Sequence, residues 1–351
     1  EAAGLKKPLA RPIKKITKSA ASSAASSAAP SLARSEPLVR IGFLGLGIMG
    51  SAMAGNLIRA GFQVSGFDPT ANARQQLKAA GGKPCRSADE LVASVQVVIC
   101  SLPNASALKE NAEILANSGH KGLLVIETST LDPRDKEAAR ARVAKSGVIL
   151  LDCPLSGTGA QAKRKDLTVY ASGPKADIRR LVPVFEGFSK AHFDLGAFGN
   201  GMKMKLMANL LVAIHNVSTA EALLLGQRWG ISPRKAVEVL SDGAGGSRML
   251  QVRGPFMEDE GWKEVTMKIS VWQKDMYLIS QALAETQVAA PLFAATVPIY
   301  NAAMGMGHAS HDTAAVFDVL SRMCSEPTKS ASKSASKSVT KSATKSASKK
   351  R

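Results

Sequence analysis

The side chains best suited to proton transfer in this sequence are Lys205 and Asn209. They lie four residues apart in a stretch, about residues 202–228, in which apolar residues recur at helical spacing, so both lie on one face of the expected helix. Lys203 points about 200° away from Lys205 around that helix and cannot serve the same site. Burial would lower the pKa of a lysine toward that of a general base. Spacing alone leaves a surface lysine as the alternative.

A glycine-rich turn is the second group of residues with chemical meaning. An apolar run over residues 38–44, typical of a buried strand, leads into the pattern G-x-G-x-x-G and then into a helical pattern over residues 52–60. The first glycine permits a tight turn, the second lets the backbone approach a pyrophosphate, and the third allows close packing of helix on strand. The helix N-terminus attracts the anion. The six residues of this predicted cofactor site are Gly45, Leu46, Gly47, Ile48, Met49 and Gly50.

The next expected strand, residues 62–67, ends at Asp68, 18 residues after the last glycine of the pattern. An acid at this place accepts hydrogen bonds from the adenine-ribose hydroxyls of a dinucleotide and repels a 2′-phosphate. Turn and acid together predict a nicotinamide dinucleotide, with NAD preferred and NADP as the alternative. The structural alternative is a glycine turn in an unrelated α/β unit.

The elements that must position these residues alternate between strands and helices in the first half of the chain. Further apolar runs predict strands over residues 95–100, 122–126 and 148–151. This alternation predicts an α/β Rossmann domain, a doubly wound parallel sheet, over residues 38–198. Ligands of such sheets bind beyond the carboxyl ends of the strands, which places Leu102, Pro103 and Thr130 beside the cofactor.

A loop rich in small residues follows the strand at 148–151. Free backbone N–H groups and a serine hydroxyl are suited to binding a carboxylate, so Ser156, Gly157 and Thr158 are candidate substrate-binding residues. Composition alone leaves an irregular connection as the alternative.

The second half of the chain shows helical patterns only. Residues 267–285 and 292–304 are helical by pattern, and the cap pair Ser232–Pro233 predicts a helix start, as the pair Asp132–Pro133 does in the sheet domain. We therefore expect an all-helical substrate and dimerisation domain over residues 199–325, joined to the sheet domain by the long helix that carries Lys205.

Composition limits the class of protein. Of the 351 residues 45% are hydrophobic, which excludes a chain disordered throughout, and no apolar run reaches the ~18 residues of a membrane span, so we expect no membrane partner. Four scattered cysteines exclude a disulfide framework and indicate a reducing, cytoplasmic location. The five histidines show no ligand spacing, and no metal site is predicted.

The net charge of +18 belongs mainly to the two ends. Residues 1–35 and 326–351 together hold fifteen basic and two acidic residues, which leaves +5 for the rest of the chain. Both ends are low-complexity, so we expect disordered basic extensions over residues 1–37 and 326–351. Three roles stay open: solvated tails, weak contact with nucleic acid or another polyanion through counterion release, and, for the first extension, a mitochondrial transit peptide.

Four separated segments together resemble the β-hydroxyacid dehydrogenase family, a branch of the 6-phosphogluconate dehydrogenase superfamily that includes 3-hydroxyisobutyrate dehydrogenases. The segments are GFLGLGIMGSAMAGNL at 42–57, DCPLSG at 152–157, the pattern G-x-G-x-x-x-K-x-x-x-N at 199–209, and Lys274–Asp275. The resemblance covers residues 38–323, nearly the whole chain between the two extensions.

This resemblance implies hydride transfer between nicotinamide and a small β-hydroxy acid or its semialdehyde, by a homodimer or homotetramer. Lys205 would be the general base or acid, and Asn209 would orient the substrate. Ser156 and Gly157 would hold the substrate carboxylate, and Lys274 would close the site near both nicotinamide and substrate. Imine reductases resemble this fold but usually lack the lysine, so the retained Lys205 argues against them. The alternatives are an imine- or aldehyde-reducing relative and a protein with a dehydrogenase fold that its basic ends direct to nucleic acid or another polyanion.

The chain departs from the family in the substrate loop. Thr158, Ala160 and Lys165 stand where the family has glycine. Added bulk and charge at these places leave the substrate open.

Overall fold

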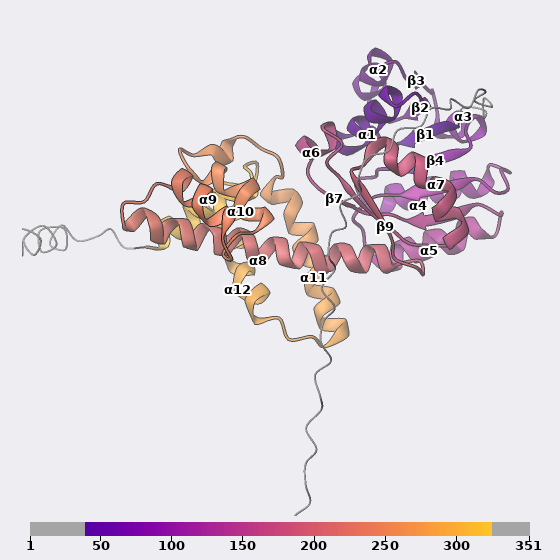
Figure 1. The fold of residues 1–351 in the computed structure, drawn as a ribbon. Helices are drawn as coiled ribbons and strands as arrows, with labels where there is room; N and C mark the ends of the chain where they lie inside the picture. The colour runs from indigo at the N-terminus through magenta and orange to yellow at the C-terminus, as the bar shows by residue number, and fades with distance from the viewer. Residues whose placement is uncertain (1–38, 325–351) are drawn as a thin grey trace, which may run out of the picture. The chain divides into compact units, whose positions relative to one another are not determined.

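A computed structural model of the protein describes residues 39–324 (Figure 1). The expected extensions over residues 1–37 and 326–351 lie outside the described residues.

The first part of the described chain is built on a six-stranded parallel sheet in the order β3-β2-β1-β4-β5-β6. Its strands are β1 (Arg40–Leu44), β2 (Gln63–Phe67), β3 (Lys83–Pro84), β4 (Val97–Cys100), β5 (Leu124–Glu127) and β6 (Ile149–Asp152). The chain runs outward from β1 to β3 and returns to β4 on the other side of β1. The strand order therefore reverses between β1 and β4, where open α/β sheets bind ligands. The expectation of a doubly wound parallel sheet is confirmed.

Helices cover both faces of this sheet (Figure 1). They are α1 (Ile48–Arg59), α2 (Ala71–Ala79), α3 (Ala88–Ser94), α4 (Ala105–Asn117), α5 (Pro133–Ala144), α6 (Gly159–Lys163) and α7 (Lys175–Phe188). Alternation along β1 sends Phe43 into one core, with Met53 of α1 and Phe185 of α7, and Leu44 into the other, with Leu108 of α4. Helix α1 begins four residues before the predicted helical pattern, because the glycine turn leads directly into it.

A second, three-stranded sheet adjoins the substrate loop and was absent from the sequence prediction. Its strands β7 (Leu155–Ser156), β8 (Thr168–Ala171) and β9 (Ala191–Asp194) stand in the order β7-β8-β9, with β7 antiparallel to β8. Strands of two to four residues are too short to leave a clear periodic pattern.

Among the described residues, every regular element after Asp194 is helical. These elements are α8 (Asn200–Arg228), α9 (Pro233–Asp242), α10 (Arg248–Arg253), α11 (Ile269–Thr286), α12 (Pro291–Gly305), α13 (Val316–Met323) and the 3₁₀ turns η1 (Gly254–Met257), η2 (Gly261–Lys263) and η3 (Thr313–Ala315). Helix α8 contacts α10, α11, α12 and α13 and contributes Ala213, Ala220 and Leu223 to their shared core. The regular elements change from strands to helices between Asp194 and Asn200.

Within residues 39–324, α8 is the one helix whose length and composition would allow it to cross a membrane. Its buried residues include the polar side chains Lys205, Asn209 and Asn216, and it packs against the helices α9 to α13. The central helix of a helical core meets the same criterion of length and composition.

Candidate active site

The glycine turn after β1 has the geometry of a pyrophosphate cradle. Gly45 has φ +93°, and a Cβ there would lie 2.2 Å from the Ser101 carbonyl oxygen. A Cβ on Gly50 would lie 2.2 Å from the Gly45 carbonyl oxygen, so α1 can pack this closely only on glycine. At Gly47 the space beside the backbone is open, and no side chain caps the first N–H groups of α1. These residues fit a dinucleotide, whose phosphates the helix N-terminus would bind.

Asp68 lies at the end of β2, beside this turn. Its Oδ2 accepts a hydrogen bond from the Leu46 backbone N–H (2.8 Å), and its Oδ1 accepts one from Thr70 N–H (2.8 Å). The side chain of Leu46 is buried in the core, so Leu46 contributes its backbone to the turn and not its side chain. Arg74 donates a hydrogen bond to the Asp68 carbonyl oxygen.

A cavity of about 520 Å³, which we call the cofactor cavity, extends from the glycine turn to the helical region. Six of the predicted cofactor-binding residues line it: Ile48, Met49, Leu102, Pro103, Thr130 and Lys274. Lys274 of α11 spans the two parts of the chain, since its ammonium donates a hydrogen bond to the Thr130 carbonyl oxygen.

A second cavity of about 420 Å³, the substrate cavity, lies along α8. Ser156, Gly157, Thr158 and Asn209 line it, as the sequence predicts for a substrate site. Lys205 lines both cavities, as do Gly157 and Thr158. Lys205 therefore lies where cofactor and substrate would meet, whereas Lys203 is exposed.

The surroundings of Lys205 adjust its basicity. Its side chain is 9% exposed, and burial lowers the pKa of Lys205, with a further lowering from the Lys274 charge. The Asp275 carboxylate opposes both effects. Burial in turn raises the pKa of Asp275, which also lines both cavities. A lysine whose pKa is lowered in this way is better suited to accept and return a proton than a solvated lysine.

Asp275 is a site residue that the sequence indicated only as the neighbour of Lys274. Its Oδ2 accepts a hydrogen bond from the Asn209 side-chain amide at 3.0 Å, and its Oδ1 lies 3.6 Å from the Lys274 ammonium. Asp275 thereby fixes the direction of Asn209, one helical turn beyond Lys205. The partner of Asn209 lies 66 residues away along the chain, which no local pattern reveals.

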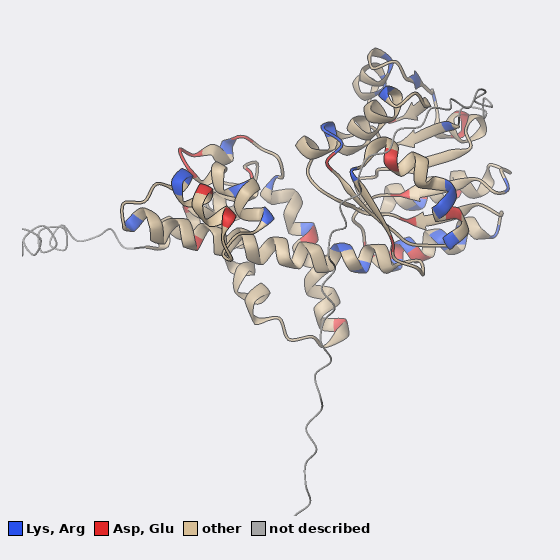
Figure 2. Cartoon of the chain, viewed as in Figure 1, with Lys and Arg blue, Asp and Glu red and all other residues tan. Residues whose placement is uncertain are grey.

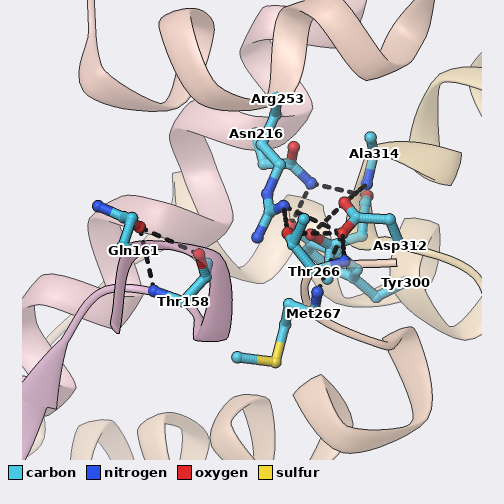
Figure 3. Close-up of polar contacts among 10 residues, drawn as sticks. Thr158, Gln161, Asn216, Arg253, Thr266, Met267, Tyr300, Asp312 and Ala314 are labelled. Carbon is cyan, nitrogen blue, oxygen red and sulfur yellow. Dashed lines mark hydrogen bonds and ion pairs between the residues drawn. The ribbon is translucent and has the colours of Figure 1, made fainter. Parts of the chain in front are cut away.

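The substrate loop differs from expectation at Thr158. Its backbone N–H was expected to be free for a carboxylate, but it donates to Gln161 Oε1 at 3.0 Å (Figure 3). Gln161 reaches back from the first turn of α6, which is the capping-box arrangement. Ser156 and Gly157, the latter with φ +133°, line the substrate cavity. Lys165, at the end of this loop, adopts φ +61°, a backbone conformation that favours glycine.

A buried polar cluster around Asp312 shapes the wall of the cofactor cavity and was also missed (Figure 3). The Asp312 Oδ2 accepts hydrogen bonds from Thr266 N–H (2.8 Å), Met267 N–H (3.0 Å) and Arg253 Nη1 (3.0 Å). Since Thr266 and Met267 line the cavity, the carboxylate fixes that segment of the wall. Arginine and aspartate lie 59 residues apart, so their pairing becomes visible only in the folded chain.

Comparisons with known proteins identify the family of this chain. Residues 40–222 match the profile of the NAD binding domain of 6-phosphogluconate dehydrogenase, and residues 199–320 match that of the NAD-binding region of NADP-dependent 3-hydroxyisobutyrate dehydrogenase. An L-threonate dehydrogenase of Cupriavidus necator is 32% identical over 283 residues, which cover 80% of this chain and 95% of that protein. A chloroplastic glyoxylate/succinic semialdehyde reductase of Arabidopsis thaliana is 31% identical over 80% of this chain and 79% of that protein.

A solved structure shows the same arrangement of elements. The 3-hydroxyisobutyrate dehydrogenase of Mycobacterium tuberculosis, solved with L-serine, superimposes with a TM-score of 0.73 at 30% identity, covering 81% of this chain and 99% of that one. The predicted resemblance is thereby confirmed over most of the described residues. The chain belongs to the β-hydroxyacid dehydrogenase family of nicotinamide-dependent oxidoreductases.

Proposed function

We propose that this protein is an NAD-preferring dehydrogenase of a small β-hydroxy acid or its semialdehyde, with Lys205 as general base in oxidation and general acid in reduction. The observation that carries the proposal is the place of Lys205, buried where the cofactor cavity and the substrate cavity meet. The relatives act on L-threonate and on glyoxylate or succinic semialdehyde, small hydroxy acids or aldehydes of one chemical class.

In the proposed reaction the chain's own residues hold the substrate and move its proton. Ser156 and Gly157 bind the carboxylate, and Asn209, held by Asp275, orients the hydroxyl toward Lys205. The neutral Lys205 Nζ accepts the hydroxyl proton while the C–H bond breaks, which leaves a carbonyl group. The bound nicotinamide supplies the acceptor for the hydride. In the reverse direction the Lys205 ammonium returns the proton to the carbonyl oxygen.

Preference for NAD over NADP is supported by Asp68. Its carboxylate lies at the end of β2, at the edge of the sheet where the adenine ribose binds in this fold. A negative charge there favours ribose hydroxyls over a 2′-phosphate.

The proposal is tested by Lys205→Met, with Lys203→Met as the matched control on the same helix. We expect Lys205→Met to lower kcat by about 10²- to 10⁴-fold, the usual contribution of a general base, with NAD affinity unchanged in calorimetry. Lys203→Met should keep normal turnover. The substrate is found by screening hydroxy acids, semialdehydes and cyclic imines with both cofactors. Near-normal turnover by Lys205→Met, or turnover of imines alone, would contradict the proposal.

A further inference from the structure

A charged triad is buried beside the carboxyl ends of β5 and β6. Lys136 of α5, Glu127 of β5 and Asp152 of β6 are each at most 1% exposed. The Lys136 Nζ lies 2.6 Å from Glu127 Oε2 and 2.7 Å from Asp152 Oδ1. Burial lowers the pKa of Lys136, but the two carboxylates outweigh burial and raise it, so the lysine stays charged. The Lys136 ammonium compensates the charge of the two buried carboxylates, which would otherwise repel each other.

One branch of hydrogen bonds leads from the triad to the cofactor cavity. The Glu127 Oε1 accepts from Ser129 N–H at 2.9 Å, and the Ser129 hydroxyl oxygen accepts from Leu102 N–H at 2.8 Å. Leu102 and Ser129 both line the cofactor cavity. The carboxylate that Lys136 neutralises thus sets the positions of two loops that would contact the dinucleotide.

The other branch leads to the helix that carries Lys205. The Asp152 Oδ2 accepts from Met202 N–H at 2.8 Å, in the first turn of α8. The hydroxyl of Ser172 lies beside it, donating to the Asp152 carbonyl oxygen at 3.0 Å and accepting from Gly201 N–H at 2.9 Å. Lys205 follows Gly201 by about one helical turn. The negative charge of Asp152 also interacts favourably with the dipole of α8, because it lies at the N-terminus of that helix.

We propose that Lys136, which lines neither cavity, is a positioning residue that couples the cofactor loops to the Lys205 helix through Glu127 and Asp152. The inference rests on the proposed function, in which Lys205 and the dinucleotide must meet in a fixed geometry. Without the Lys136 charge the two carboxylates repel each other, and each of them holds one side of the reaction site. A displacement of about 1 Å at such a site lowers turnover by about 10²-fold.

Each of the two branches of hydrogen bonds can be tested with its own serine variant. Ser129→Ala removes the acceptor of Leu102 N–H, and we expect it to weaken NAD binding about threefold to tenfold, the loss of one hydrogen bond of ~1 kcal/mol. Ser172→Ala removes the acceptor of Gly201 N–H, and we expect a fall in kcat of similar size with NAD affinity unchanged.

Lys136→Met should show both effects, weaker NAD binding in calorimetry and a kcat lowered by about tenfold or more. Lys145→Met, at the exposed C-terminal end of α5, is the matched control and should match the wild type. Melting temperatures separate these effects from loss of fold.

Two results would overturn the inference. The first is wild-type NAD affinity in a folded Lys136→Met protein. The second is a change of one and the same quantity, either NAD affinity or kcat, in both Ser129→Ala and Ser172→Ala. The measurements of NAD affinity need no substrate. A wild-type enzyme that turns over no hydroxy acid refutes the proposed function, while NAD affinity in Lys136→Met and Ser129→Ala still decides the coupling to the cofactor loops.

Discussion

At the scale of single residues, the chemistry of this protein depends on how one buried lysine is surrounded. Two charged side chains adjust Lys205 in opposite directions, since Lys274 lowers its pKa and Asp275 raises it. Both come from α11, which packs against α8. The site is therefore tuned by a helix far away in the sequence, and this tuning can be tested with two matched variants.

The oxidation rate should rise with pH as Lys205 loses its proton, so the position of that rise reports the pKa of Lys205. Lys274→Met removes a cation that lowers this pKa, and the rise should move to higher pH. Asp275→Asn removes an anion that raises it, and the rise should move to lower pH. The measurement is kcat/KM against pH for both variants and the wild type. Shifts in the same direction, or none, would show that another group controls the rate.

Cofactor choice is a second property decided by one side chain. We expect Asp68→Ser to raise the ratio of kcat/KM for NADP over NAD by about tenfold or more, because like charges brought together cost several kcal/mol. Asp68→Asn keeps a hydrogen-bond acceptor but removes the charge. If charge decides the preference, both variants shift the ratio. An unchanged ratio in both variants would exclude charge at Asp68 as the cause.

At the scale of elements, the start of α8 is the most constrained contact. A Cβ on Gly201 would lie 2.4 Å from the Tyr170 carbonyl oxygen and 2.6 Å from that of Asp152. Gly199 before it has φ +89° and serves as N-cap. Gly199 and Gly201 therefore shape the turn before α8 and let α8, which carries Lys205, approach β6 and β8 closely.

Gly201→Ala should lower the free energy of unfolding by about 1–3 kcal/mol, because the added methyl group forces the helix away from the strands. Gly226→Ala is the matched control on the same helix, since its Cβ would meet nothing closer than 3.8 Å. That change should be neutral or stabilising by up to ~1 kcal/mol, as alanine is the better helix former. Urea denaturation measures both. Equal effects of the two variants would contradict the packing argument.

At the scale of the whole molecule, most of the net positive charge belongs to residues 1–35 and 326–351. Figure 2 shows acidic and basic residues interspersed over both the sheet and the helical region, in keeping with the modest net charge of +5 over residues 36–325. We propose that the basic extensions bind polyanions without a role in catalysis. Removing residues 326–351, with eight basic residues and one acidic residue, should weaken binding to a short DNA duplex and reduce its salt dependence, with NAD-linked turnover unchanged. Duplex binding that survives the deletion, or that ignores salt, would contradict this role.

Assembly is the other property at this scale. Large apolar side chains of the helical region remain exposed, among them Trp229 (72%), Leu292 (68%) and Tyr277 (63%). Such side chains on a helical surface favour association, and we propose a homodimer or homotetramer. Light scattering should give two or four times the mass of one chain. A monomer at micromolar concentration would refute the proposal.

The sequence by itself determined the parts whose signals are local. The glycine turn, the strands around it, the caps at Asp132 and Ser232, and the shared face of Lys205 and Asn209 follow from spacing of a few residues, and the structure places them as expected. Backbone sterics and helix periodicity act over such distances, so one chain segment carries the information.

Only the tertiary structure decided which distant groups meet. Asp275 beside Asn209, Lys136 between Glu127 and Asp152, and Asp312 against the cavity wall are buried pairings of residues remote in sequence. A buried polar group must find a partner wherever the packed chain brings one, and no period or spacing records that choice. The Thr158 N–H is the exception, because the Gln161 side chain that accepts from it lies only three residues away in a capping box, a spacing that the sequence does record.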